Sequence, residues 1–300
     1  MNQSLKYLTV VGFTGALAAC GGGGSSSSTG ETGSVSVGLT DAPVDSAREV
    51  NIEVTALVLQ PSDGERSRFE LEFPEPINLL DLQGGAFESL ISDEEVPAGA
   101  YNWMRLELGD DNTVVIDNET GTGTYPLTTP SARGVQTSGF TVPAGGEVSL
   151  TIDFDVRKSL VKAVGQDGYK LKPVLRLVDN AQVGTIKGTI GQTLLATCTD
   201  ANAYAGGVYI FEELDVTPND LGSENEPLVV APVDTETGEY DYTAAFLPAG
   251  DYTVAYTCDM DERQDAEGNM IDEELDFTPG VNAEVIEGEV TTVDLTAAES

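Results

Sequence analysis

The stretch Glu147-Val-Ser-Leu-Thr-Ile-Asp-Phe-Asp-Val156 decides the fold of this chain. Apolar residues stand at every second position from Val148 to Val156, and polar residues fill the positions between them. Because successive side chains of a β-strand point to opposite faces, this alternation predicts a strand with one face on a core and the other in water. Such half-buried strands are typical of antiparallel sheets.

The same alternation recurs in short runs on both sides of this stretch, at 33–39, 50–55, 69–73, 208–210, 239–243 and 252–256. Glycine and proline separate the runs, as in Pro97-Ala-Gly99 and Pro143-Ala-Gly-Gly146, and this spacing predicts turns. Only two short helices are expected, around 79–90 and 157–164. The chain is therefore predicted to be all-β, with two antiparallel β-sandwich domains of immunoglobulin-like architecture.

The first 32 residues have a different character. One positive charge at Lys6 precedes an apolar run from Tyr7 to Ala19, which is shorter than the roughly 20 residues that span a bilayer and has the layout of a secretory signal. The run ends in Leu17-Ala-Ala-Cys20, and a tract of glycine and serine follows immediately. This string resembles the lipobox of bacterial lipoproteins. The alternative is an ordinary secretory signal with a chance cysteine.

The lipobox resemblance implies that residues 1–19 are a signal peptide and that Cys20 becomes a lipidated N-terminus. It would carry a diacylglycerol and an amide-linked acyl chain such as palmitate, and several chains together hold a protein firmly on a membrane. Residues 20–32 are then the lipidated cysteine and a flexible linker. Position 21 is Gly rather than Asp, which in Gram-negative lipoproteins favours sorting to the outer membrane. The resemblance therefore implies a lipid-anchored protein of the cell envelope, at the outer membrane.

The chain is strongly acidic, with 51 Asp and Glu against 14 Lys and Arg and a net charge of −37. The charge is uneven, because residues 181–300 hold 26 acidic residues and only two basic ones, Lys187 and Arg263. Such a surface repels phosphate backbones, so nucleic acid is not expected as a partner. Solubility in a salty environment and binding of divalent cations both remain as explanations of the charge.

Histidine is absent, which excludes Ser-His-Asp and Cys-His catalysis and histidine-ligated zinc. The string Ser159-Leu-Val-Lys162 matches the S-x-x-K pattern of serine acyl-enzymes but lacks its companion motifs, and a structural use is expected. We therefore expect no enzyme and no cofactor, calcium excepted. Besides Cys20 there are two cysteines, Cys198 and Cys258, and in an exported protein such a pair predicts a disulfide. Two free buried thiols are the alternative.

The densest acidic run follows Cys258 directly and reaches Glu274. Within it Asp259, Asp261 and Asp265 are candidate ligands, because calcium prefers six to eight oxygen ligands and a loop containing glycine can wrap around the ion. The spacing departs from the EF-hand pattern, since Arg263 falls where an oxygen ligand belongs. A solvated loop without metal is the alternative.

Four strings carry a family resemblance: Gly33-Ser-Val-Ser-Val-Gly-Leu-Thr-Asp-Ala-Pro43, Val96-Pro-Ala-Gly-Ala-Tyr-Asn-Trp-Met-Arg-Leu106, Phe154-Asp-Val-Arg-Lys-Ser-Leu-Val161 and Gly168-Tyr-Lys-Leu-Lys-Pro-Val-Leu-Arg176. Together they resemble the bacterial domain-of-unknown-function family 4382, which occurs in predicted lipoproteins. The resemblance covers residues 33–180 and implies a β-sandwich domain. It implies no activity.

A second domain is expected over residues 183–297. The string from Gly238 to Val254 resembles transthyretin-like sandwiches of the carboxypeptidase-regulatory type. The pentapeptide Pro-Ala-Gly-x-Tyr occurs at 97–101 and again at 248–252, where it predicts a tight turn that leads into a strand with a packed tyrosine. Two related modules are one interpretation of this repeat, and coincidence is the other.

The single tryptophan, Trp103, lies in an alternating run and is expected to be buried rather than exposed as a platform for sugars. Taken together, the sequence predicts a membrane-anchored lipoprotein of the cell envelope that acts as a non-catalytic structural or interaction module. The alternative is a surface lipoprotein that binds polysaccharide or calcium. The expected partners are the membrane, through the N-terminal lipid, and an envelope protein or polysaccharide.

Overall fold

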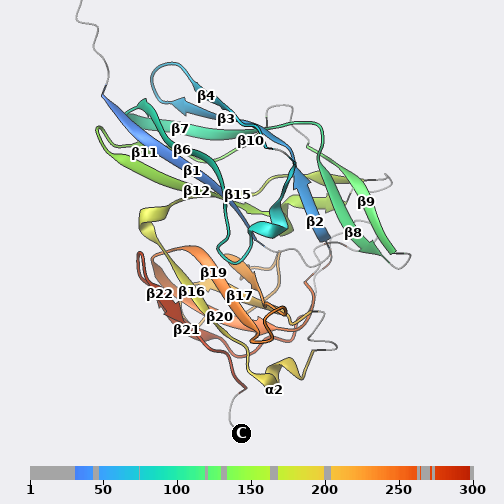
Figure 1. Ribbon diagram of the computed structural model, residues 1–300. Coiled ribbons are helices and arrows are strands. Elements are labelled where there is room, and N and C mark those ends of the chain that lie inside the picture. The colour runs from blue at the N-terminus through green and yellow to red at the C-terminus, as the bar shows by residue number, and fades with distance from the viewer. Residues whose placement is uncertain are drawn as a thin grey trace, which may run out of the picture. The chain divides into compact units, whose positions relative to one another are not determined.

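The computed structural model describes residues 31–42, 47–73, 75–118, 121–129, 134–162, 168–198, 204–261, 264, 271 and 274–297. These residues confirm the all-β prediction (Figure 1). Four helical turns accompany the strands: η1 (Leu79–Leu82), α1 (Val156–Ser159), η2 (Asn180–Gln182) and α2 (Gln192–Leu195). No helix among the described residues is both long and apolar enough to cross a membrane. The predicted signal peptide and Cys20 lie outside the described residues.

Three sheets form from residues 32–179. The first has the order β15 (Leu175–Asp179), β12 (Glu147–Asp155), β1 (Thr32–Ala42), β6 (Glu88–Pro97). The second has the order β10 (Val135–Gln136), β7 (Gly99–Leu108), β3 (Val54–Pro61), β4 (Ser67–Glu70), and β11 (Phe140–Val142) also pairs with β7. The third has the order β13 (Leu160–Lys162), β14 (Tyr169–Leu171), β9 (Gly121–Thr128), β8 (Thr113–Asn118), β2 (Ala47–Ile52), β5 (Ile77–Asn78).

Two further sheets form from residues 183–292. One has the order β19 (Asp241–Pro248), β16 (Val183–Thr189), β22 (Val290–Thr292). The other has the order β18 (Val229–Pro232), β17 (Gly207–Glu212), β20 (Gly250–Thr257), β21 (Val281–Val285).

Strand β12 is the alternating stretch with which the sequence analysis begins. Its residues Leu150, Ile152 and Phe154 are buried in the core, as the alternation predicts. The pairing of β12 with β1, however, is parallel, and so are the pairings of β14 with β9 and of β16 with β22. The expectation of purely antiparallel sheets was therefore wrong in these places. Alternation reports that one face is buried, and it does not report the direction of the neighbouring strand.

One pattern of strand pairing occurs twice along the chain. In the first copy, β1 lies between antiparallel β6 and parallel β12, and β7 lies between β3 and β11. In the second copy, β16 lies between antiparallel β19 and parallel β22, and β20 lies between β17 and β21. Strands β4 and β18 occupy equivalent edges, beside β3 and β17.

The repeated pentapeptide lies at the same place in both copies. It joins β6 to β7 and β19 to β20, and each tyrosine hydroxyl donates a hydrogen bond to the carbonyl of its own proline: Tyr101 to Pro97 at 2.8 Å and Tyr252 to Pro248 at 2.7 Å. Glycines Gly33 and Gly184 are also equivalent. A Cβ at Gly33 would lie 2.3 Å from the carbonyl oxygen of Pro143, and one at Gly184 would lie 2.4 Å from that of Ile286. Both sites therefore require glycine because backbone approaches them closely.

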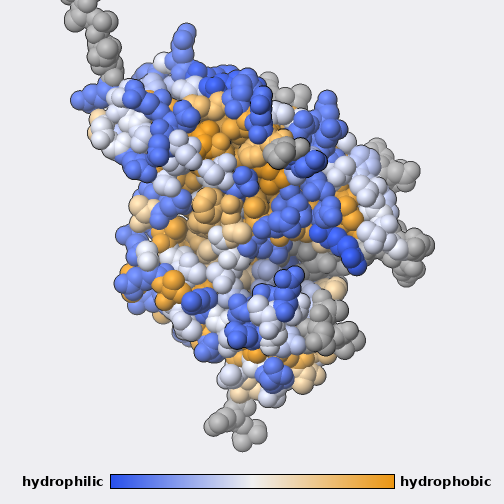
Figure 2. Space-filling model, in the orientation of Figure 1, coloured by the Kyte–Doolittle hydropathy of each residue, from blue (hydrophilic) through white to orange (hydrophobic). Residues whose placement is uncertain are grey.

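Separate apolar clusters hold these sheets together. The largest gathers buried residues between Val35 and Leu171, and a second gathers residues between Ile186 and Leu295. A third and smaller cluster contains Tyr209, Phe211, Val230 and Ala255, and Val216 and Phe277 pack against it. The division into domains at 33–180 and 183–297 stays a prediction. Hydrophilic side chains cover much of the face shown in Figure 2, and apolar surface appears there in separate patches.

Both predicted helices are shorter than expected. The first is the single turn η1, which Asn78 caps by accepting a hydrogen bond from the Leu80 amide at 3.3 Å. It cannot continue because Gly84 and Gly85 adopt positive φ angles, after which the chain enters β6. The second helix is the single turn α1. Residues 160–162, which were expected to extend it, pair with β14 as a strand.

Candidate functional site

Cys198 and Cys258 form a disulfide, and their Cα atoms lie 5.3 Å apart. The bond joins the segment after α2 to the end of β20. The hydroxyl of Tyr256 lies 3.2 Å from Sγ of Cys198 and 3.0 Å from Sγ of Cys258, and it donates a hydrogen bond to the Ala205 carbonyl at 2.7 Å. Burial raises the pKa of Tyr256 to about 12, so the hydroxyl keeps its proton at neutral pH.

A buried cluster of charged and aromatic side chains connects α1 with the acidic segment after Cys258. Nη1 of Arg157 donates to the hydroxyl of Tyr209 at 3.1 Å, and that hydroxyl donates to Oδ2 of Asp261 at 3.1 Å. The same carboxylate oxygen accepts the amide of Leu221 at 3.1 Å and lies 3.9 Å from Nη1 of Arg157. The side chains of Arg157 and Asp261 are 4% and 2% exposed, so their opposite charges stabilise one another in the interior.

Lys158 makes a second set of polar contacts beside this cluster. Its Nζ lies 3.0 Å from Oε1 of Glu226 and 3.6 Å from Oδ2 of Asp155, and it donates to the Pro227 carbonyl at 3.4 Å. Burial raises the pKa of Asp155, and the positive charge of Lys158 partly opposes this shift. Arg157 and Lys158 thus connect α1 to residues that follow β17 in the chain.

The sequence analysis did not identify this cluster. Arg157 and Lys158 stand in the string that resembles the known family, but nothing in the sequence links Arg157 to Asp261, which is 104 positions away. The one available signal was the rarity of basic residues in so acidic a chain. Two consecutive basic residues directly after the apolar run of β12 are therefore candidates for ion pairs with carboxylates elsewhere in the chain.

The structure places two of the three predicted calcium ligands. Asp259 is exposed, and its Oδ2 accepts the amide of Asp276 at 2.7 Å, whereas Asp261 is buried against Arg157. Asp265 lies outside the described residues. Among the described residues, no group of three or more acidic or cysteine side chains is arranged to hold a metal ion. Calcium binding stays a prediction, and the contacts of Asp261 give this residue a structural role.

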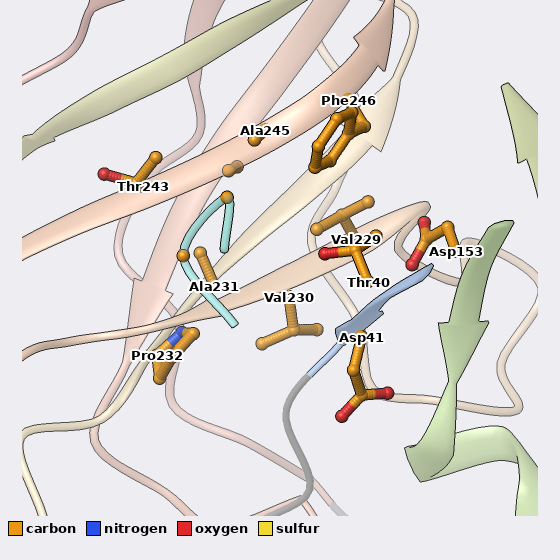
Figure 3. A pocket seen from close by; sticks show the side chains of 13 residues that line it. Thr40, Asp41, Asp153, Val229, Val230, Ala231, Pro232, Thr243, Ala245 and Phe246 are labelled. Carbon is orange, nitrogen blue, oxygen red and sulfur yellow. The ribbon is translucent and has the colours of Figure 1, made fainter. Parts of the chain in front are cut away.

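A small cavity lies between strands that are distant in the sequence (Figure 3). Thr40, Asp41 and Asp153 line one side, and residues 229–232 and 243–246 line the other. The hydroxyl of Thr40 donates to the carbonyls of Leu82 and Ala86, and Asp153 accepts from Arg176 at 2.6 Å. The cavity volume of about 20 Å³ is room for roughly one water molecule, so it does not suit an organic substrate.

Ser159, the candidate of the S-x-x-K pattern, is fully buried. Its hydroxyl donates to the Asp155 carbonyl at 2.5 Å and accepts the Val174 amide at 2.8 Å. These two bonds to backbone give Ser159 the structural use that the sequence analysis expects.

Trp103 is half-buried, so it lies between the predicted burial and the alternative of an exposed platform. The ring is half-buried on the outer face of the sheet formed by β10, β7, β3 and β4, and two arginines lie against it. The guanidinium carbon of Arg105 lies 4.2 Å from the ring centroid and that of Arg66 lies 5.2 Å from it. The position follows from register: Trp103 pairs with Gln60, whereas the core side of the same sheet is filled by Leu57, Leu59 and Met104. Trp103 is therefore a surface group held by cation–π contacts.

Comparison with known families identifies the first part of the chain. Residues 32–173 match the family described as Domain of unknown function (DUF4382). These residues therefore form such a domain, in agreement with the resemblance of the four strings, and the description of the family names no activity. No curated protein matches the chain.

Several solved structures are similar to the chain at a low level. The minor pilin GBS52 of Streptococcus agalactiae is 9% identical, with 87% of this chain and 94% of that chain covered and a TM-score of 0.22. BcpA, the major pilin subunit of Bacillus cereus, is 10% identical, with 89% and 99% covered and a TM-score of 0.22. The TIE protein of Bacillus anthracis is 14% identical, with the same TM-score, and the chain spans about a third of its length. At these TM-scores we draw no functional argument from the likeness.

Proposed function

We propose that this protein is a lipid-anchored lipoprotein of the cell envelope, at the outer membrane, whose β-domains act as a non-catalytic interaction module. The observation that carries the proposal is the string Leu17-Ala-Ala-Cys20 with the glycine and serine tract directly behind it. A lipidated Cys20 needs such a tether between the membrane and the folded part. Residues without apolar side chains suit this role because they do not join a core.

The disulfide supports the export of the chain. Disulfides persist in oxidising compartments outside the cytoplasm and are rare within it. The bond between Cys198 and Cys258 joins residues 60 positions apart and lies beside the packed Tyr256, which is the setting of a structural disulfide. This bond and the predicted N-terminal export signal together support a location in the cell envelope.

The interaction role is supported by how the described polar groups are used. The buried polar groups Arg157, Asp261 and Ser159 bind other parts of the same chain, and the cavity beside Thr40 holds about one water. The surface, in contrast, carries a tryptophan with two arginines. Recognition at a sheet face is a role that this arrangement suits better than chemistry in a cleft.

The anchor can be tested by labelling cells that express the protein with an alkyne analogue of palmitate. We expect the natural protein to incorporate the label and to sediment with membranes. The variant Cys20→Ser should lose the label and either remain unprocessed or leave the membrane fraction, whereas Cys198→Ser should keep both properties. Label that persists in Cys20→Ser, or an unlabelled protein in the cytosol with its first twenty residues intact, would disprove the anchor.

A further inference from the structure

The repeated strand pattern allows two equivalent sheet faces to be compared. In the second copy, the face that points away from the main core carries Tyr209, Phe211 and Ala255, and Phe277 covers it at ring distances of 4.9 Å from Tyr209 and 6.4 Å from Phe211. In the first copy, the equivalent face of β3 and β7 carries Val58, Gln60, Trp103 and Arg105. No apolar cluster comparable to that around Phe277 forms over it among the described residues.

The residues of this open face are brought together by strand register. Arg105 and Arg68 both pair with Val58, and Trp103 pairs with Gln60, so their side chains share one side of the sheet. Arg66 reaches the ring of Trp103 from the turn between β3 and β4. We call Trp103, Arg66 and Arg105 the arginine–tryptophan face. Ala56 and Val58 lie buried beneath these side chains.

The two arginines of this face have donors to spare. Nε of Arg66 donates to Oε1 of Gln60 at 2.5 Å, and Nη2 of Arg105 donates to Oε1 of Gln136 at 3.0 Å. Nε of Arg105 is buried and has no hydrogen-bond partner. A guanidinium offers five N–H donors, so each of these two groups keeps donors that have no partner among the described residues.

Basic and acidic side chains lie together on and beside this face. The nearby carboxylates of Glu70 and Glu107 pair with Arg68, whereas no carboxylate of the described residues forms an ion pair with Arg66 or Arg105. Asp63 and Glu65 lie exposed in the same turn. The guanidinium groups of Arg66 and Arg105 therefore carry positive charges without a paired carboxylate among the described residues, and each can form such a pair with a ligand.

We propose that the arginine–tryptophan face binds a polysaccharide that carries carboxylate groups, such as a polymer of uronic acids. A guanidinium binds a carboxylate through two parallel hydrogen bonds, and a tryptophan ring presents a broad apolar surface with a polar edge. A uronic acid offers both matching groups, because its carboxylate is attached to a saturated ring. Arg66 and Arg105 bind the carboxylate, and the sugar ring packs against Trp103. This inference rests on the interaction role proposed above and names its partner class.

The observations favour a polysaccharide over a protein partner. A protein interface needs a buried centre with apolar anchors in pockets, and neither the cavity beside Thr40 nor those beside Glu212 and Arg157 are lined by Trp103, Arg66 or Arg105. A slender polysaccharide needs only a flat face with a ring and a few donors.

Trp103 is the only tryptophan, so its fluorescence reports directly on the face. The full chain in mild detergent and 0.15 M NaCl is titrated with polygalacturonate. We expect a saturable change in fluorescence and an affinity that falls as salt is raised. The control ligand is polygalacturonate whose carboxylates are methyl-esterified. Its affinity should be lower by about tenfold or more, because a charged hydrogen bond contributes roughly 1.5–3 kcal/mol and 1.4 kcal/mol corresponds to tenfold.

The matched variants are Arg66→Gln and Arg105→Gln against Lys187→Gln. All three remove one positive charge, but Lys187 is exposed on β16, away from the arginine–tryptophan face. Each arginine variant should lose about tenfold in affinity and Lys187→Gln should lose none, with circular dichroism showing that each variant is folded. An absent fluorescence change, an equal response to the ester, or an equal loss in Lys187→Gln would overturn the proposal. Binding of poly-glutamate in place of polygalacturonate would also overturn it and assign the face to an acidic protein.

This titration is made in solution and does not depend on Cys20. A protein that binds polygalacturonate but takes up no acyl label would refute the anchor and keep the ligand. A labelled protein that ignores polygalacturonate would refute the ligand and keep the anchor.

Discussion

The sheet face formed by β3 and β7 and the face formed by β17 and β20 have the same strand pairing. Different side chains lie over the two faces. In the second copy the face is aromatic, and Phe277 closes over it. Arg157, which comes from the first part of the chain, donates to Tyr209 of this face from the helical turn α1. In the first copy the face bears the half-buried Trp103 beside two arginines, and no comparable apolar cluster forms over it among the described residues. The same backbone pairing thus makes a core in one place and a surface in the other.

This difference teaches that strand pairing and the use of a face are decided separately. Pairing follows from alternation and from the turns, such as the two Pro-Ala-Gly-x-Tyr segments whose tyrosines bond back to proline. The use of a face follows from which segment lies over it, and that segment comes from elsewhere in the chain. The four predictions below test this distinction, beginning with the largest expected effect.

The largest effect is expected from Asp261→Ala. The variant leaves Arg157 buried without its carboxylate and the Leu221 amide without its acceptor, which typically costs about 3–5 kcal/mol in the free energy of unfolding. Urea denaturation measures this loss. The matched control is Asp259→Ala, two positions away, whose exposed carboxylate accepts one amide and should cost about 1 kcal/mol or less. Equal losses in the two variants would show that the buried cluster does not stabilise the covered face.

The next effect is expected on removal of the disulfide by Cys198→Ala with Cys258→Ala. The bond closes a segment of 60 residues, and bonds of this kind contribute roughly 2–4 kcal/mol in the chain-entropy model. Thermal unfolding should begin at a lower temperature, and hydrogen exchange should rise first in strands β17 and β20, which lie within this segment. Exchange that rises equally in β3 and β7 would mean that the two copies unfold as one unit.

The third prediction compares the two covers directly. Phe277→Ala removes a ring that packs on Tyr209 and Phe211, and it should cost about 2 kcal/mol, less than a fully buried phenylalanine because the ring is half-buried. Trp103→Ala removes a half-buried ring whose neighbours include the guanidinium groups of two arginines rather than an apolar cluster, and it should cost about 1 kcal/mol or less. Thermal unfolding with both variants measures the difference. A larger loss for Trp103→Ala would make the open face part of the core.

The smallest effect is expected at Asp155, where burial raises the pKa of the carboxyl group. A raised pKa in the folded state means that this group favours folding at pH below its ordinary value of 3.8 and loses that contribution as pH rises through its folded pKa. Asp155→Asn keeps an oxygen that can accept the Lys158 amide, as the carboxylate does at 3.0 Å. The variant should therefore be as stable as the natural protein at pH 3.5 and equal or slightly more stable at pH 7.

Melting temperatures across pH 3.5–7 measure this effect for both proteins. A loss of stability in Asp155→Asn that is confined to neutral pH would mean that the ion pair with Lys158 outweighs the cost of burying the carboxylate.

The sequence by itself determined the all-β class, the position of β12, the disulfide partners and the DUF4382 domain. It could do so because alternation, turn residues and cysteine pairs are local or compositional signals. The same signals misjudged the helices after Asn78 and Asp155, since cross-strand pairing and the left-handed Gly84 and Gly85 outweigh a short apolar pattern.

Only the tertiary structure decided that Asp261 compensates Arg157, that β1 and β12 run parallel, and that Trp103 lies on the surface between two arginines. Each of these depends on a pairing between residues far apart in the chain, either strand to strand or charge to charge. A period-two pattern assigns a side chain to one of two faces and carries no information about what lies over that face. The cover is set by the folded arrangement of distant segments, which is why one face became core and its equivalent became a candidate binding surface.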